Sequence, residues 1–243
     1  MEVIYMKLIV FTVLLGFIFL SFSFEVNAEN WDIVYDGSIV PYDKSLGKDA
    51  FLFGDANVEK NLKDFVSVVE DNDAVNGTAL HIKDTKAEGG KLAFFKHEVN
   101  FDTGTAEVRV KSLENTDGWA VGFGMGDGSL EIDVHMYPDR VEIYQGPKYD
   151  IDMKTYRVVR AVKEGKNATI YVDGKQVLKG VVSASTNLFW WGAGSSNGIG
   201  DGYWDYLAYT LSGAFSPDKL PSPLVAPVEP RGKLATIWAS IKK

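Results

Sequence analysis

One segment restricts the fold more than any other part of the chain. Residues 168–180 read ATIYVDGKQVLKG, in which Ile170 and Val172 alternate with Tyr171 and an apolar pattern resumes at Val177. Between them, Asp173-Gly174 supplies the residues that favour the positive φ angles of a tight two-residue turn. Alternation on both sides of an Asp-Gly pair is the strongest short-range signal for a β-hairpin. An antiparallel sheet is therefore predicted here.

The same period of two recurs upstream, and helical periodicity is nearly absent. In TAEVRVKS (105–112), Ala106, Val108 and Val110 point to one side and the charged residues to the other. Further short strands are expected at 31–35, 78–84 and 92–97, separated by glycine-rich or Asn-Gly turns. Short strands at spacings of about 8–12 residues indicate an all-β sandwich or barrel. A chain of 243 residues is long enough to fill the core between two sheets.

Composition excludes several classes of protein. The chain has no cysteine, so disulfide bonds, thiolate metal sites and a lipid-anchored lipoprotein are all excluded. Its net charge is -8, with the acidic residues dispersed. That charge argues against a nucleic-acid partner and against binding to an anionic membrane surface.

Residues 1–28 are predicted to be a signal peptide. An almost unbroken apolar run, LIVFTVLLGFIFLSFSF, follows Lys7, and Val26-Asn27-Ala28 places small residues at a cleavage position. The alternative is an uncleaved N-terminal membrane anchor, since the run is near the lower length limit for a membrane span. Either reading predicts a secreted or cell-surface protein.

The C-terminal part differs in composition from the rest. Residues 216–232 form a predicted linker rich in proline, which favours an extended conformation. Residues 233–243 place Leu234, Ile237, Trp238 and Ile241 on one side of a short amphipathic helix. Such a helix either packs back on the sandwich or docks to a partner, and both readings remain open.

The hairpin is followed by an aromatic strand and then by the segment GDGYWDYLAYTLSGAFSP. This order resembles the end of a laminin-G-like domain of the concanavalin A-like lectin/glucanase superfamily. The resemblance implies an antiparallel two-sheet jelly-roll sandwich over residues 29–215, with one concave sheet. It also implies a protein that binds or acts on glycans. The hairpin itself supports a fold better than a function.

The candidate residues for the glycan chemistry that this resemblance implies lie in SLEIDVHMY (129–137). On a strand, Leu130, Ile132, Val134 and Met136 occupy one face, and Glu131, Asp133 and His135 the other. Laminarinase-type glycosidases of the superfamily carry Glu-x-Asp-x-Glu, and Glu131 and Asp133 match the nucleophile and its helper. His135 stands where the acid/base glutamate belongs. The three residues are thus candidates for catalysis, for ligand binding without catalysis, or for a solvent-facing polar strand face.

Other candidates are aromatic and acidic. Trp190 and Trp191 are adjacent, so a strand directs them to opposite faces and only one of them can lie in the core. Trp191 and Trp204 are taken as candidate ligand-binding residues, with core packing as the alternative. The loop SSNGIGDG (195–202) predicts a weak calcium site at Asp201. No other cofactor is expected.

Three functions are compatible with these features. The first is a secreted, non-catalytic carbohydrate-binding domain that uses the concave sheet face or its rim. The second is a glycoside hydrolase of the laminarinase type with a degenerate Glu131-x-Asp133-x-His135 strand. The third is a protein-interaction or structural domain at the cell surface.

Overall fold

The structure is a computed structural model, and it describes residues 31–54, 65–84, 93–181, 186–194 and 198–220. The predicted signal peptide, most of the proline-rich linker and the predicted C-terminal helix lie outside these residues, so those expectations remain predictions. Among the described residues, no helix has the length and apolar character needed to cross a membrane.

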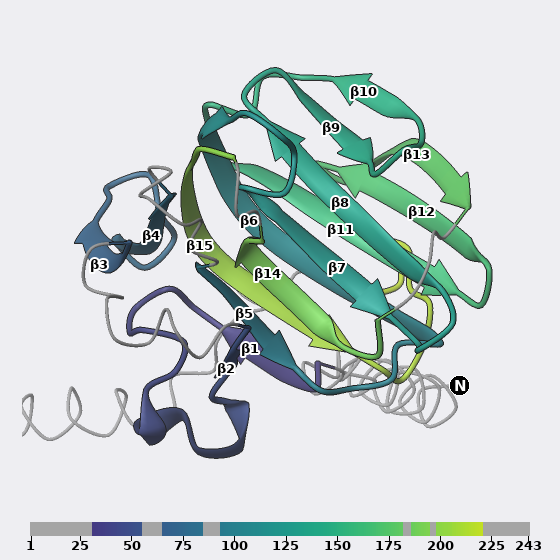
Figure 1. Cartoon of the computed structure of the whole chain (residues 1–243), viewed down its shortest axis with the longest axis horizontal. Helices are drawn as coiled ribbons and strands as arrows, with labels where there is room; N and C mark the ends of the chain where they lie inside the picture. The colour runs from purple at the N-terminus through teal and green to yellow at the C-terminus, as the bar shows by residue number, and fades with distance from the viewer. Residues whose placement is uncertain (1–30, 55–64, 85–92, 182–185, 195–197, 221–243) are drawn as a thin grey trace, which may run out of the picture.

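Two antiparallel sheets lie one over the other and are not closed into a barrel (Figure 1). In the described part of the chain the first sheet, sheet A, has the strand order β13 (Lys175–Val181), β12 (Asn167–Val172), β11 (Arg157–Glu164), β6 (Thr103–Asn115), β15 (Gly200–Thr210), β4 (Thr78–Asp84) and β3 (Val66–Glu70), with β1 (Ile33–Tyr35) also paired to β15.

The second sheet, sheet B, has the order β10 (Lys148–Asp150), β9 (Arg140–Ile143), β8 (Glu131–Tyr137), β7 (Gly122–Gly126), β14 (Phe189–Ala193), β5 (Ala93–His97) and β2 (Leu52–Phe53). A short 3-10 segment, η1 (Lys44–Asp49), precedes β2. The predicted antiparallel jelly-roll sandwich is confirmed.

The predicted hairpin is β12–β13. Asp173 and Gly174 have φ angles of 49° and 79°, and Val172 pairs with Lys175 directly across the turn. Two consecutive positive φ angles give the turn a twist that matches the right-handed twist of the two strands. Local sequence alone therefore determines this element.

Side chains from both sheets fill the layer between them. Trp191 of β14 and Trp204 of β15 are fully buried and meet edge to face, with ring centroids 5.1 Å apart. Large aromatic residues of this kind contribute much of the apolar area that stabilises a sandwich. The core thus joins the centres of the two sheets.

The described chain ends in a segment that packs against sheet A. The Thr105 hydroxyl donates to the carbonyl oxygen of Gly213, and Arg160 Nη1 donates to the carbonyl oxygen of Leu220. Arg160 also forms a buried ion pair with Glu107. These contacts hold residues up to Leu220 against the domain, five residues beyond the predicted boundary at 215.

Candidate functional site: the outer face of sheet B

The alternation of β8 separates its side chains as predicted. Ile132, Val134 and Met136 belong to the core between the sheets. Glu131, Asp133 and His135 therefore point to the opposite, outer face of sheet B. Their side chains are not open to solvent, however: the exposed fractions of the three residues are 4%, 2% and 1%. The reading of this strand face as solvent-facing is wrong.

Glycines of β7 leave space for an aromatic side chain that covers these polar residues. Gly126, Gly124 and Gly122 lie directly opposite Glu131, Asp133 and His135 in the register of β7 and β8. A Cβ atom on Gly124 would lie 1.9 Å from Trp190 Nε1, so the indole of Trp190 rests directly on the backbone of β7. A side chain at this glycine would exclude the indole.

Trp190 reaches across the glycines and binds the first carboxylate. Its Nε1–H donates a 2.8 Å hydrogen bond to Glu131 Oε1. The ring of Trp119 stacks on that of Trp190, with centroids 5.6 Å apart and planes inclined by 21°. Phe94 of β5 meets the other side edge to face. An aromatic cluster thus covers the polar residues of β8.

His135 lies within the same cluster. Its ring centroid is 4.8 Å from that of Trp119 and 5.4 Å from that of Tyr144. The nearest carboxylate is Glu142, with 4.0 Å between Nδ1 and Oε1. Burial lowers the pKa of His135 to about 4, so the imidazole is neutral at neutral pH.

The two carboxyl groups of β8 hold a proton. Burial, and then the nearby charge of Glu131, raise the pKa of Asp133 to about 9. Two carboxylates packed on one strand face cannot both ionise cheaply, since like charges at short range repel. At neutral pH, Asp133 is therefore the protonated member, and it is hydrogen-bonded to Glu131.

Three buried polar atoms of this face make no hydrogen bond to any described residue. They are Oδ1 of Asp133 and both ring nitrogens of His135. Buried polar groups in folded proteins are nearly always paired, because an unpaired one costs about 1–3 kcal/mol. This concentration of unpaired atoms on one strand face distinguishes it from ordinary core packing.

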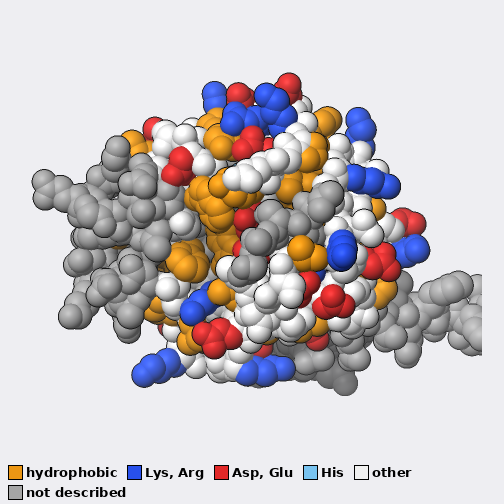
Figure 2. Space-filling model, turned by 45° about the vertical axis from the view of Figure 1, so that its right-hand side comes forward, with side chains coloured by type: hydrophobic (Ala, Val, Ile, Leu, Met, Phe, Trp, Pro, Cys, Tyr) orange, Lys and Arg blue, Asp and Glu red, His pale blue; other side chains and the backbone are white. Residues whose placement is uncertain are grey.

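A cavity of about 190 Å³ opens beside the aromatic cluster. Its lining joins three aromatic residues, one carboxylate and a loop, namely Phe94, Trp119, Trp190, Glu131, Thr186, Leu188 and Gly194. In the space-filling view, hydrophobic side chains gather in the middle of the visible face with acidic side chains among them (Figure 2). Among the described residues of this lining, Glu131 is the one that carries a charged side chain.

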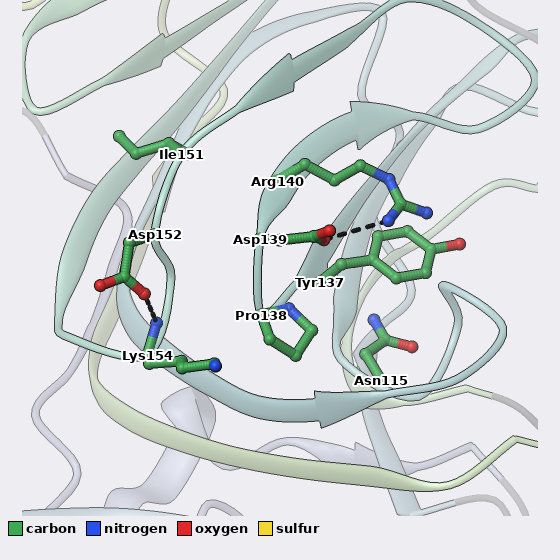
Figure 3. A pocket seen from close by; sticks show the side chains of 8 residues that line it. All are labelled: Asn115, Tyr137, Pro138, Asp139, Arg140, Ile151, Asp152 and Lys154. Carbon is green, nitrogen blue, oxygen red and sulfur yellow. Dashed lines mark hydrogen bonds and ion pairs between the residues drawn. The ribbon is translucent and has the colours of Figure 1, made fainter.

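A second, wider cavity of about 540 Å³ lies at the far end of β8, beside the turn between β8 and β9 (Figure 3). Tyr137 and Arg140 line it from one side, and Ile151 and Lys154 from the other. Tyr137 lies two residues beyond His135, so its side chain belongs to the same face of the strand.

The structure corrects two candidates from the sequence. Trp191 and Trp204 were expected to bind a ligand, but both are fully buried between the sheets and present no indole face to a ligand. The physical reason is the alternation of β14, which directs Trp191 inward and its neighbour Trp190 outward. Trp190, on the outer face, is the indole that lies against the polar residues of β8.

The carboxylate of Asp201 contacts two basic residues. It lies 2.9 Å from His81 Nε2 and 3.4 Å from Lys83 Nζ. No group of three or more potential metal ligands occurs among the described residues, although 195–197 of the predicted calcium loop lie outside them. The calcium site remains an untested prediction.

Glu131 and Asp133 place two carboxyl groups on one strand face. A retaining glycosidase needs two carboxyl groups about 5–5.5 Å apart, one as nucleophile and the other as acid. Here burial raises the pKa of Asp133 to about 9 and lowers that of His135, the residue at the third position, to about 4, so both are uncharged at neutral pH. The face is therefore equipped for hydrogen bonding and aromatic contact, with the group that would act as acid replaced.

The sequence signals for the missed residues were present. Gly122, Gly124 and Gly126 alternate with Phe123 and Met125, so one face of this strand carries no side chains. Such a strand next to Glu131-x-Asp133-x-His135 indicates close approach of another group. Which group approaches depends on the pairing of β7 with β14.

No known family model and no curated protein matches the sequence. Among solved structures, a beta-glucanase of Bacillus licheniformis is 13% identical, with a TM-score of 0.44 over 60% of this chain and 82% of that chain. Alginate lyase AlgAT5 from Polysaccharide Lyase family 7 is 14% identical, with a TM-score of 0.44 over 65% of this chain and 88% of that chain.

Domain 4 of AbnA, an extracellular arabinanase from Geobacillus stearothermophilus solved with arabinotriose, is 15% identical, with a TM-score of 0.44 over 64% of this chain and 79% of that chain. These values say nothing about the activity of the present chain. The order and pairing of its strands carry the fold assignment. By that topology, the chain has the fold of an antiparallel two-sheet jelly-roll sandwich.

Proposed function

We propose that this chain is a secreted or cell-surface carbohydrate-binding domain that holds a neutral glycan on the outer face of sheet B. The observation that carries the proposal is the cavity in which Trp119, Trp190 and Phe94 surround the carboxylate of Glu131. Aromatic rings beside a hydrogen-bonding carboxylate suit a sugar, which has apolar C–H faces and a rim of hydroxyl groups.

Each lining group has a distinct part in this proposal. Trp119 is only partly buried, so its ring offers contact area to a sugar face. Glu131 already accepts the indole N–H of Trp190. A carboxylate pair has acceptor capacity for further donors, so sugar hydroxyls are suitable additional partners. The protonated Asp133 carries no charge at neutral pH, which reduces the cost of burying its carboxyl group.

The proposal is tested by binding measurements on a panel of glycans. The neutral glycans laminarin, mixed-linkage β-glucan and arabinan are titrated against the full chain by isothermal calorimetry. The variant Trp119→Ala is expected to lose roughly ten- to a hundredfold in affinity, as central aromatic residues of binding sites do. Trp31→Ala is the matched control, since Trp31 is also partly buried and lies before β1 of sheet A.

Two results would overturn the proposal. If no glycan in the panel and none on a broad array binds, the protein-interaction or structural reading takes its place. If Trp119→Ala and Trp31→Ala bind equally well, the site lies elsewhere on the molecule.

The hydrolase remains the second candidate, and one observation favours it: Asp133, whose pKa is raised to about 9, is hydrogen-bonded to Glu131. A carboxyl group that holds its proton at neutral pH is suited to help a neighbouring nucleophile. Release of reducing ends from laminarin or mixed-linkage β-glucan by the wild-type chain, abolished in Glu131→Gln, would establish hydrolysis. Binding without such release supports the non-catalytic domain.

A further inference from the structure

Strand β8 runs from the narrow cavity at Glu131 to the wide cavity at Tyr137. Tyr137 follows Glu131 by six residues on the same strand, which corresponds to about 20 Å along it. Both side chains point to the outer face of sheet B, because residues an even number apart share a face. Strand β8 therefore contributes Glu131 to the narrow cavity and Tyr137 to the wide one.

One loop lies between the cavities. A Cβ atom placed on Gly118 would be 2.4 Å from His135 Nδ1 and 2.6 Å from the Tyr137 hydroxyl. Gly118 is anchored by Asn115, whose amide donates to the Gly118 carbonyl oxygen and accepts from its N–H. Asn115 lines the wide cavity, and Trp119 lines the narrow one. The same loop thus forms a wall of both.

The wide cavity offers fixed polar groups. The guanidinium of Arg140 lies 3.5 Å from the centroid of the Tyr137 ring. Its Nε donates to Glu142 at 3.0 Å and its Nη1 to Asp139 at 3.1 Å (Figure 3 shows the second contact). The side chain is consequently held in one orientation. Pre-ordered groups of this kind lose little entropy when a ligand binds.

The opposite wall is complementary in chemistry. The exposed ammonium group of Lys154 forms no ion pair with the described residues, and the carboxylate of Asp152 accepts from the Lys154 backbone N–H. Pro138 and Ile151 add apolar surface. The described residues that line the cavity include two basic and two acidic ones, so their charges balance. A balanced mixture of donors, acceptors and apolar area suits a neutral polyhydroxylated ligand better than an anion.

We propose that the wide cavity between Tyr137, Arg140 and Lys154 is a second saccharide subsite, so that one neutral oligosaccharide spans both cavities. This inference rests on the proposed function, because it takes the Trp119–Glu131 cavity as the first subsite. Its consequence is a requirement for chain length: a disaccharide reaches the first subsite alone, whereas a longer chain also reaches Lys154.

The experiment compares disaccharides with hexasaccharides derived from laminarin, mixed-linkage β-glucan and arabinan, by calorimetry on the full chain. For wild type, the hexasaccharide of the recognised glycan is expected to bind about tenfold or more tightly than its disaccharide, the gain from one charge-assisted hydrogen bond. Lys154→Ala and Arg140→Ala are expected to remove that gain and to leave disaccharide affinity unchanged.

Controls make the outcomes separable. Lys179→Ala removes another exposed lysine, from β13 of sheet A, and is expected to retain the full preference for the longer chain. Equal affinity of wild type for both lengths, or a preference that survives both cavity variants, overturns the second subsite and leaves the proposed function standing. Absence of binding to every oligosaccharide overturns the proposed function, and this inference falls with it.

Discussion

Asp133→Asn is the most informative single substitution for the site on sheet B. Asp133 is 2% exposed and lies beside Glu131, and its pKa is raised from 3.8 to about 9. Asparagine has nearly the same shape and still donates a hydrogen bond toward Glu131, but it cannot ionise. The substitution thus removes the titration of Asp133 while preserving most of the packing.

The sign of the effect follows from proton binding. Between pH 3.8 and about 9, the folded chain keeps the Asp133 proton and the unfolded chain has lost it. Stability of the wild type therefore falls as pH rises through this interval, by about 1.4 kcal/mol per pH unit. From about pH 5 to about pH 8 the loss amounts to at most about 4 kcal/mol. In Asp133→Asn this loss is absent.

The assay is urea unfolding of both proteins at about pH 5 and about pH 8, at equal ionic strength. The free energy of unfolding of the variant, relative to wild type, is expected to increase with pH. His135 titrates near pH 4 in both folded proteins, so its contribution cancels to a first approximation in the difference. Asp139→Asn, which changes a carboxylate with a 76% exposed side chain, is the control and is expected to show no such trend.

If the difference between Asp133→Asn and wild type is the same at both pH values, or shrinks at the higher one, then Asp133 does not carry the proton. The carboxyl pair would then be solvated, and the buried, aromatic-covered site described here would be wrong.

Three further substitutions test other parts of the site and the core. His135→Phe is expected to raise stability by about 1–3 kcal/mol, because both ring nitrogens lack partners. The gain should be larger near pH 5 than at pH 7, because the lowered pKa of His135 costs the wild type stability as pH falls below 6.5. Lower melting temperatures of the variant at both pH values would contradict this prediction. Gly124→Ala should displace Trp190, shift tryptophan fluorescence and weaken glycan binding. Gly122→Ala, whose added Cβ atom would have its nearest contact at 3.1 Å, should change fluorescence and binding less. Equal effects of the two substitutions would show that the indole does not rest on Gly124. Trp204→Ala should cost about 3–5 kcal/mol in urea unfolding yet leave glycan affinity intact in the folded protein, and a selective loss of affinity would return Trp204 to the binding site.

The sequence by itself determined the local geometry of this protein. Period-two alternation separated Ile132 and Val134 from Glu131 and Asp133, and Asp173-Gly174 specified the hairpin of β12 and β13. Both signals act over a few residues, since a strand exposes alternate faces and a tight turn requires positive φ angles. The sandwich class followed from repeating these signals along the chain.

Tertiary structure decided what each face meets. Alternation required Trp190 and Trp191 to diverge, but only the position of β14 between β7 and β5 placed Trp191 in the core and Trp190 over Gly124. The same pairing turned a polar strand face into a covered one, in which the Asp133 proton is retained and the His135 proton is lost. The reason is physical: β14 lies more than sixty residues beyond β7, and no local pattern encodes contacts at that separation.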